Sequence, residues 1–257
     1  MTHSTPTSPS ADGFGGATKT GRWLCADWEK RFVARWVSRV PPWIETWHLT
    51  LATLAWCALA VAGGALAAGV DWRWLSLVSL ALALQYATDL FDGAVGRHRD
   101  TGLVRWGFYM DHLLDFVFLC SLFVAWGLAL PEAQNAWGLA LLGLAGAGMA
   151  SSFLAFAATG EFRISHGGVG PTELRLAAIA ANQALVAWGP PRLDLALPAA
   201  VAVAAALLAC VVVANHRALW ALDLELRARS ADASGEGEGH DGEVGTHDRG
   251  GDAGVGR

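Results

Sequence analysis

Four aspartates lie at regular spacing in one stretch of the chain, TDLFDGAVGRHRDTGLVRWGFYMDHLLD, residues 88–115. Asp89 and Asp92 are three residues apart, so they share one face of a helix. Asp111 and Asp115 are four apart and share a face of the next helix. A short connection makes two such helices antiparallel neighbours, and all four carboxylates then converge. Because hard divalent cations prefer carboxylate oxygens, the spacing predicts a metal site.

The residues around these aspartates are apolar, which makes uncompensated charge costly. Asp115 follows two leucines and precedes FVFL. An Asp at the bilayer centre costs roughly 2.5–3.5 kcal/mol, and four would cost on the order of 10 kcal/mol, less near the interface. That is comparable with the stability of a whole domain. Solvated aspartates at helix ends would explain Asp92 alone but not Asp115, so we expect bound cations.

Three glycines and an arginine accompany the aspartates. Gly93 follows the first pair directly, and Gly96 and Gly107 flank the connection. Glycine inside a helix costs about 1 kcal/mol relative to alanine, and it is tolerated where a ligand or a backbone must approach closely. Arg97 lies between the two pairs, where its planar donor fork suits a phosphate. Arg97 is therefore a candidate phosphate contact.

The composition indicates that lipid surrounds the elements that position these residues. Hydrophobic residues make up 54% of the 257 residues and charged residues only 16%, whereas a soluble domain carries about 25% charged residues. A helix needs ~20 apolar residues to cross a bilayer. Six stretches meet this length, at residues 48–70, 73–95, 105–130, 135–159, 173–189 and 194–215. The fifth is the weakest, because Asn182 and Gln183 interrupt it.

The flanking segments predict the rest of the domain organisation. Residues 1–21 are rich in Ser, Thr, Gly and Pro, which is typical of disorder. Residues 22–40 are basic and amphipathic with tryptophan at the edge, which favours a helix on an anionic membrane surface over a soluble packed helix. Residues 41–228 are the membrane domain, and 229–257 a disordered cytoplasmic tail. The predicted fold is an all-α integral membrane protein with six transmembrane helices after an amphipathic surface helix.

Basic residues set the predicted orientation. With the N-terminus inside, all of the 18 Lys and Arg residues except Arg73 and Arg192 fall on the inner side, as the positive-inside rule requires. Both termini of this multi-pass protein then face the cytoplasm, and so do the loops 96–105 and 160–172. The aspartates lie near the inner surface of the cell membrane. The net charge of −5 shows no nucleic-acid footprint.

This stretch resembles the fingerprint of the CDP-alcohol phosphatidyltransferase family. The fingerprint reads D-x-x-D-G-x-x-A-R, a short gap, then G-x-x-x-D-x-x-x-D. The chain has Asp89-x-x-Asp92-Gly93-x-x-Gly96-Arg97, nine residues, then Gly107-x-x-x-Asp111-x-x-x-Asp115, which matches seven of the eight fixed positions. The departure is Gly96, where the family usually has alanine. Six spans and an N-terminal surface helix are also what the family shows.

The resemblance implies a role for each matched residue. Asp89, Asp92, Asp111 and Asp115 are expected to hold Mg²⁺ or Mn²⁺, two ions per site. Asp115 is also expected to be the general base toward an alcohol acceptor. The expected contacts of the CDP-activated donor are Gly93, Gly96, Arg97 and Gly107. Two metals can clamp the pyrophosphate and stabilise the leaving CMP.

The nature of the donor stays open at this point. CDP-diacylglycerol with a small alcohol acceptor is favoured. Gly170-Pro171-Thr172-Glu173 and Asp111-His112 instead resemble choline- and ethanolaminephosphotransferases, in which a CDP-aminoalcohol reacts with diacylglycerol. Arg163, His166, Glu173 and Arg175 are candidate contacts for the acceptor or a lipid head group; solvated positive-inside residues are the alternative. Membrane lipids are expected partners, and a homodimer is compatible with the sequence.

Two other classes compete with an enzyme. Intramembrane carboxylates also mark cation transporters, but a transporter does not need Gly93, Gly96 and Arg97 at this spacing, and the chain shows no repeated halves. An inactive relative that serves as a membrane scaffold would not need all four aspartates. Phospholipid synthesis with release of CMP is therefore the leading interpretation.

Overall fold

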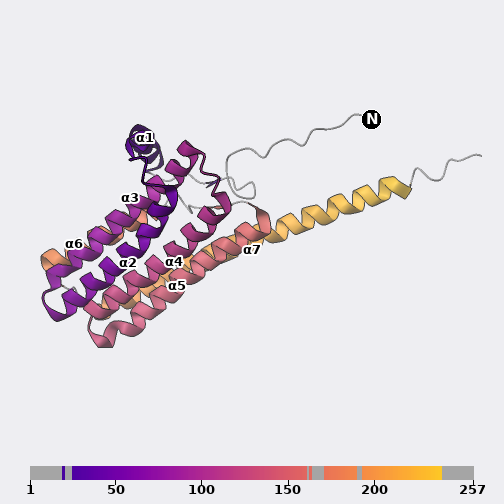
Figure 1. The fold of residues 1–257 in the computed structure, drawn as a ribbon. Helices are drawn as coiled ribbons and strands as arrows, with labels where there is room; N and C mark the ends of the chain where they lie inside the picture. Colours follow the sequence, from indigo (N-terminus) through magenta and orange to yellow (C-terminus); the bar gives the residue numbers. More distant parts are fainter. Residues whose placement is uncertain (1–18, 21–24, 161, 164–170, 190–192, 239–257) are drawn as a thin grey trace, which may run out of the picture. The chain divides into compact units, whose positions relative to one another are not determined.

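The computed structural model of the chain places a helix over each predicted apolar stretch. It describes residues 19–20, 25–160, 162–163, 171–189 and 193–238. Contacts divide the chain into two units, Met1–Val212 and Val213–Arg257. The α-helices in the described residues (Figure 1) are α1 (Ala26–Trp36), α2 (Thr46–Gly69), α3 (Leu75–Arg99), α4 (Val104–Ala129), α5 (Asn135–Thr159), α6 (Pro171–Trp188) and α7 (Leu193–Glu238). Short 3₁₀ turns are η2 (Val37–Arg39), η3 (Trp72–Trp74) and η4 (Glu132–Gln134).

Within the described residues, five of these helices are long and apolar enough to cross a membrane. They are α2, α3 with η3, α4, α5 with η4, and α7 as far as Ser230. Helix α6 is not among them, because Glu173, Arg175, Asn182 and Gln183 lower its hydropathy. Five such helices make the chain a multi-pass membrane protein, as the composition predicted.

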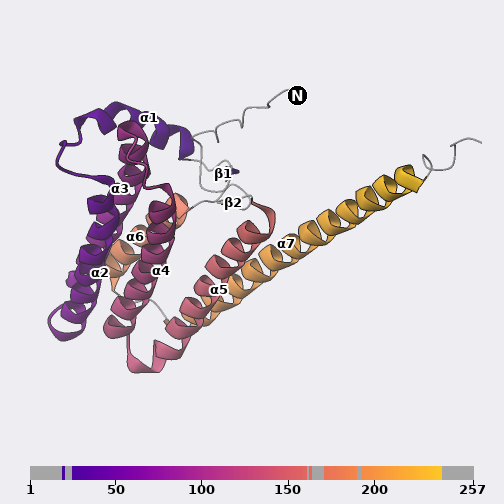
Figure 2. The same cartoon turned by 45° about the vertical axis from the view of Figure 1, so that its right-hand side comes forward.

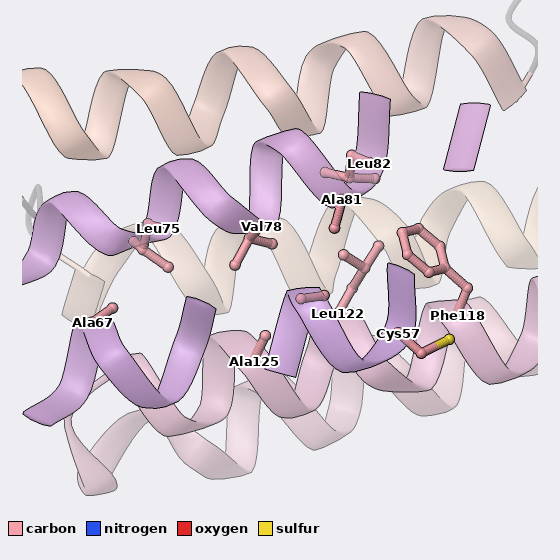
Figure 3. Close-up of a cluster of buried hydrophobic side chains, with 10 residues drawn as sticks. Cys57, Ala67, Leu75, Val78, Ala81, Leu82, Phe118, Leu122 and Ala125 are labelled. Atoms are coloured by element: carbon pink, nitrogen blue, oxygen red, sulfur yellow. The ribbon is translucent and has the colours of Figure 1, made fainter. Parts of the chain in front are cut away.

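The core of the first unit forms where α2, α3 and α4 lie side by side. It contains Cys57, Ala60, Ala67, Leu75, Val78, Ala81, Leu82, Phe118, Leu122 and Ala125 (Figure 3). Small residues let the backbones approach closely, as is common between transmembrane helices. A Cβ on Gly64 would overlap the backbone of Ala125, so only glycine permits this contact between α2 and α4. Helix α2 therefore fixes the positions of its two neighbours.

Helix α6 packs against α3 through polar as well as apolar contacts. Asn182 is buried, and its Oδ1 accepts a hydrogen bond of 2.9 Å from Nε1 of Trp126 on α4. Nε1 of Trp72 donates to the carbonyl of Leu185 at 2.8 Å. Of the two polar residues that interrupt this helix, Asn182 therefore faces protein, whereas Gln183 is exposed.

Helix α1 lies across the end of the bundle at which α3 ends (Figure 2). Phe32 stacks on Trp28 at 5.3 Å between ring centroids and meets the edge of Phe91 on α3 at 5.9 Å. Trp28 and Trp36 are exposed, whereas Glu29 is buried. Helix α1 thus has an exposed aromatic face and a face that packs on the bundle.

Arg99 binds the linker between α1 and α2, residues 37–45. Its guanidinium donates hydrogen bonds to the carbonyl oxygens of Val40, Pro41 and Ile44. The linker is therefore held at the C-terminal end of α3, where the fingerprint begins its connection to α4. Asp100, which follows, adopts a positive φ of 51° and ends the helix.

The structure departs from the sequence prediction at two places. Lys19–Thr20 (β1) pairs in parallel with Phe162–Arg163 (β2), so two short strands accompany the helices, and β1 falls within the segment predicted to be disordered. Helix α7 continues to Glu238, whereas disorder was predicted from residue 229. At the start of this extension, Arg229 pairs with Glu225 one turn earlier at 2.7 Å, a spacing that supports a helix.

Candidate active site

The aspartates of α3 and α4 meet at one end of the bundle. Helix α2 packs against both helices and brings the C-terminal half of α3 beside the N-terminal half of α4. One carboxylate oxygen from each of Asp89, Asp111 and Asp115 lies within 4.8 Å of the others. All three side chains are half-buried. Three negative charges this close repel one another, and a cation among them would offset the repulsion.

The donor set fits a hard divalent cation. Oxygen ligands lie 2.0–2.1 Å from Mg²⁺, so two ligands of one ion are at most about 4 Å apart. The three carboxylate oxygens lie within 4.8 Å of one another, so small side-chain adjustments would let all three bind one ion. Two ions ~3.5–4 Å apart, as in two-metal sites, also match a cluster of this size. Because the carboxylates are only half-buried, a substrate phosphate can reach the same place.

A cation from α6 already contacts this cluster. Nη1 of Arg175 lies 2.7 Å from Oδ2 of Asp89, and Nη2 lies 3.5 Å from Oδ1 of Asp115. The guanidinium also lies 5.7 Å from the centre of the Tyr86 ring. The sequence analysis predicted Arg175 as a contact for the acceptor or a lipid head group. In the structure its contacts are the carboxylates themselves, because α6 packs directly on α3.

The fourth aspartate is held differently. The hydroxyl of Thr46 lies 2.5 Å from Oδ1 of Asp92, and the hydroxyl of Thr50 lies 2.5 Å from its Oδ2. Asp92 is buried with both threonines, and it is not one of the three residues whose carboxylate oxygens cluster. The predicted set of four is therefore divided: three aspartates converge, and the fourth is bound to α2.

Gln85 is a site residue that the sequence analysis did not identify. Its Nε2 donates to Oδ1 of Asp115 at 2.9 Å, and its side chain is fully buried. Gln85 stands one turn before Asp89, as Thr46 stands one turn before Thr50. Two polar residues one turn apart in an apolar helix are a signal in the sequence. This signal would have identified Gln85 on α3 and the two threonines on α2.

The glycines and Arg97 differ in their surroundings. A Cβ on Gly93 would lie 3.1 Å from Nη1 of Arg97, whose side chain is exposed. A Cβ on Gly96 would lie 3.1 Å from Oγ1 of Thr46. Within the described residues, a Cβ on Gly107 would meet nothing within 4 Å. Gly107 thus has open space beside it, whereas Gly93 makes room for the guanidinium of Arg97 and Gly96 for the hydroxyl of Thr46.

The remaining predicted contacts lie at the start of α6 or before it. Oε1 of Glu173 accepts a hydrogen bond of 3.1 Å from the backbone N–H of Cys25. Burial raises the pKa of the Cys25 thiol, and the negative charge of Glu173 adds to the effect. Arg163 lies in strand β2, and His166 lies outside the described residues.

A second carboxylate near α6 joins it to α1 and α3. Oε1 of Glu29 accepts hydrogen bonds from the hydroxyls of Tyr86, at 2.8 Å, and Thr172, at 2.5 Å. Tyr86 in turn lies against Arg175. The N-terminal helix is thereby connected, through side chains in contact, to the carboxylate cluster.

Comparison with known proteins assigns the chain to a family. The model of the CDP-alcohol phosphatidyltransferases matches residues 43–220, a range that runs from just before α2 into α7 and includes every carboxylate of the cluster. Neither the curated proteins nor the solved structures gave a match. Members of the family use a divalent metal to transfer a phosphate-linked group from a CDP-alcohol to an acceptor. Because the match covers most of the chain, the protein belongs to the CDP-alcohol phosphatidyltransferase family.

Proposed function

We propose that this protein transfers a substituted phosphate from a CDP-activated donor to an alcohol hydroxyl, with release of CMP, in phospholipid synthesis. The observation that supports this most directly is the cluster of Asp89, Asp111 and Asp115 within the family fingerprint. In the reaction the acceptor oxygen forms a bond to the phosphorus that carries the donor's alcohol. The bond from that phosphorus to the CMP oxygen breaks, and CMP leaves.

We infer that Asp89, Asp111 and Asp115, together with Asp92, hold two Mg²⁺ or Mn²⁺ ions when the substrate binds. Bound metal would neutralise the pyrophosphate and stabilise the charge that develops on the leaving CMP. The contact of Arg175 with two of these carboxylates supports the assignment, because it shows that the cluster accommodates positive charge.

In this proposal Asp115 removes the proton from the acceptor hydroxyl. A positioned general base typically accelerates such a step ~10²–10⁴-fold. Gln85 and Arg175 both reach the same oxygen, Oδ1 of Asp115. Two donors on one oxygen orient the carboxylate, so that its direction is set before the acceptor arrives.

Gly93, Gly96, Gly107 and Arg97 are the proposed contacts of the cytidine diphosphate. The open space at Gly107 and the exposed guanidinium of Arg97 beside Gly93 support this assignment. Arg97 would bind a phosphate that is already charged in the ground state. Arg163, His166, Glu173 and Arg175 are proposed for the acceptor or head-group side.

CDP-diacylglycerol is the favoured donor, with a small polar alcohol as acceptor. The alternative is a CDP-aminoalcohol that reacts with diacylglycerol. The GPTE sequence at the start of α6 and the imidazole of His112 next to Asp111 favour that alternative. The two differ in which substrate carries the acyl chains, so one assay separates them.

For the membrane arrangement we propose six spans, with α6 as the fifth, and both termini in the cytoplasm. Oδ1 of Asn182 on α6 accepts a hydrogen bond from Trp126 of α4, and the carbonyl of Leu185 accepts one from Trp72 of η3; such interhelical bonds accommodate polar groups inside a bilayer. Helix α1 would lie on the membrane surface, with its exposed tryptophans in the interface. Residues 41–228 would form the membrane domain. We also propose that two copies of the protein associate as a homodimer.

The test is release of CMP by the purified protein in detergent or nanodiscs. A panel would offer CDP-diacylglycerol with several small alcohols, and CDP-choline or CDP-ethanolamine with diacylglycerol. We expect CMP from one of the two sets only, dependent on Mg²⁺ or Mn²⁺. A metal-dependent cation flux into liposomes without release of CMP would instead favour a transporter.

A further inference from the structure

The carboxylate of Asp92 is bound at both oxygens by hydroxyls of a different helix. Oγ1 of Thr46 lies 2.5 Å from Oδ1, and Oγ1 of Thr50 lies 2.5 Å from Oδ2. The Thr46 hydroxyl is also 2.8 Å from the backbone carbonyl of Asp92. The two threonines are one turn apart on α2, so two hydroxyls on one face of that helix bind the two oxygens of the carboxylate.

Asp92 and both threonines are buried, so water does not replace these hydrogen bonds. Asp92 is 8% exposed, Thr46 6% and Thr50 4%. A buried carboxylate without hydrogen-bond donors has a large desolvation cost, and hydrogen bonds to a charged acceptor are stronger than those between neutral groups. A carboxylate accepts about four hydrogen bonds or metal contacts. Two hydroxyls therefore hold the group still and leave lone pairs that can bind a cation.

Gly96 is part of the same arrangement. A Cβ at this position would lie 3.1 Å from Oγ1 of Thr46 and 3.8 Å from its Cβ. The first distance is tighter than ordinary van der Waals contact, so the Thr46 hydroxyl that bonds Asp92 would have to shift. Gly96 is also the one fixed position at which this chain departs from the family fingerprint, which has alanine there. The departure and the Thr46 hydrogen bond occur at the same point.

We propose that Thr46 and Thr50 are positioning residues that fix Asp92 for metal and donor binding, and that Gly96 replaces the family's alanine to make room for Thr46. This rests on the proposed function insofar as Asp92 belongs to the metal site. Residues that hold a metal-binding carboxylate are worth about 10–100-fold in metal affinity or activity. Helix α2, which carries no acidic residue of the fingerprint, would then contribute to the site directly.

The alternative is that the threonines only join α2 to α3. Both roles predict some loss of stability when a hydroxyl is removed, so stability alone does not decide. A positioning role also predicts weaker Mn²⁺ binding and a raised KM for the donor, in protein that remains folded. Thr53 provides a matched control, because it is equally buried on α2 at 6% exposed but lies one turn beyond the two threonines that bond Asp92.

The experiment measures Mn²⁺ binding by electron paramagnetic resonance in Thr46→Val, Thr46→Ser, Thr50→Val and Thr53→Val. We expect about 10–100-fold weaker binding for Thr46→Val and Thr50→Val, near wild-type binding for Thr46→Ser, which keeps the hydroxyl, and no change for Thr53→Val. Thermal unfolding is measured alongside. Equal Mn²⁺ affinity in Thr46→Val, Thr50→Val and Thr53→Val would overturn the proposal.

A double-mutant cycle tests the role of Gly96. Gly96→Ala should weaken Mn²⁺ binding in the wild-type background, because the new methyl group displaces the Thr46 hydroxyl. In a Thr46→Ala background the same change should add nothing, since the atom it would displace is gone. Equal, additive losses in both backgrounds would overturn the pairing.

These measurements separate the two proposals. Mn²⁺ binding does not require turnover, so it reports on Asp92 whether or not CMP is released. If the wild-type protein releases CMP and the threonine variants bind Mn²⁺ normally, the positioning role is wrong and the proposed function stands. If the wild-type protein binds Mn²⁺ but releases no CMP from any donor, the proposed function fails.

Discussion

Arg175 on α6 and Asp89 on α3 are joined by an ion pair of 2.7 Å at the carboxylate cluster. A side chain of α6 thus contributes the positive charge that the cluster needs when no metal is bound. A metal that binds the same carboxylates competes with this guanidinium. We therefore expect the arginine to stabilise the metal-free fold and to oppose metal binding.

Replacement of Arg175 by glutamine should uncouple these two effects. Removal of one partner of a buried ion pair costs on the order of 3 kcal/mol, at the low end here because Asp89 is partly exposed. We expect a lower unfolding temperature without metal and a larger upward shift on addition of Mg²⁺ than in the wild type. Thermal unfolding in detergent measures both, with Arg105→Gln, an exposed arginine on α4, as the control. An unchanged Mg²⁺ shift would contradict the competition.

Removal of metal should abolish activity reversibly. The three clustered carboxylates would lose the cations that bind the pyrophosphate. Treatment with EDTA should stop CMP release, and excess Mg²⁺ or Mn²⁺ should restore it, whereas Ca²⁺, which prefers larger and more flexible sites, should restore less. Full turnover in chelator would rule out the two-metal mechanism.

The attachment of α1 to the bundle should depend on Glu29. Glu29→Ala leaves the hydroxyls of Tyr86 and Thr172 without their acceptor, which should cost about 1–3 kcal/mol. Tyr86→Phe removes one donor and should cost less, about 1 kcal/mol. Thermal unfolding and limited proteolysis of the N-terminal segment provide the readouts, and exposed Glu132→Ala is the control. If Glu29→Ala is as stable and as protease-resistant as that control, the buried carboxylate does not hold α1 in place.

The fingerprint predicted where three of the four aspartates meet, because helical spacing and a short connection are local properties. The contacts between helices were not predictable in the same way. Thr46 is 46 residues from Asp92, and Arg175 is 86 residues from Asp89. Which face of α6 meets α3 depends on the packing of several helices, and no single segment specifies it.

The helices themselves followed from composition, with one exception in length. The apolar run that ends near residue 215 continues as helix α7 to Glu238. Sequence patterns separate apolar from polar segments well, but a polar segment rich in Ala, Leu, Glu and Arg can extend a helix. Asn182 weakens the fifth span by composition, but in the structure it is buried and its Oδ1 accepts a hydrogen bond from Trp126.

The proposed topology predicts that His98 and Ala133 lie on opposite sides of the membrane. Both positions are exposed: His98 lies in the last turn of α3, and Ala133 lies in η4. Single cysteines at these positions, in a background without Cys25, Cys57, Cys120 and Cys210, should react with an impermeant maleimide from opposite sides of oriented vesicles. His98 is preferable to Arg99, which holds the linker before α2. Labelling of both from one side would overturn the six-span arrangement.

The assignment of the general base gives the sharpest prediction. Asp115→Asn keeps the shape of the side chain and one acceptor oxygen for Gln85 and Arg175, but it cannot take a proton at neutral pH. We expect most turnover to be lost, about 10²-fold or more, while the CDP donor still binds, more weakly in proportion to any metal contact of Asp115. Turnover near the wild-type rate would show that another group or a metal-bound water takes the proton.

Two further variants distinguish chemistry from binding in the same assay. Asp92→Asn removes a carboxylate from the metal site, so both donor affinity and rate should fall. Its amide can still accept from Thr46 but presents no acceptor to Thr50, which adds to the loss. Arg97→Ala should mainly raise the donor KM, because the phosphate it is proposed to bind carries its charge before the transition state. Donor affinity and kcat are measured for all three variants after a check of folding, and we expect three different patterns. The same pattern in all three would mean that these residues act as one structural unit and that the separate roles are wrong.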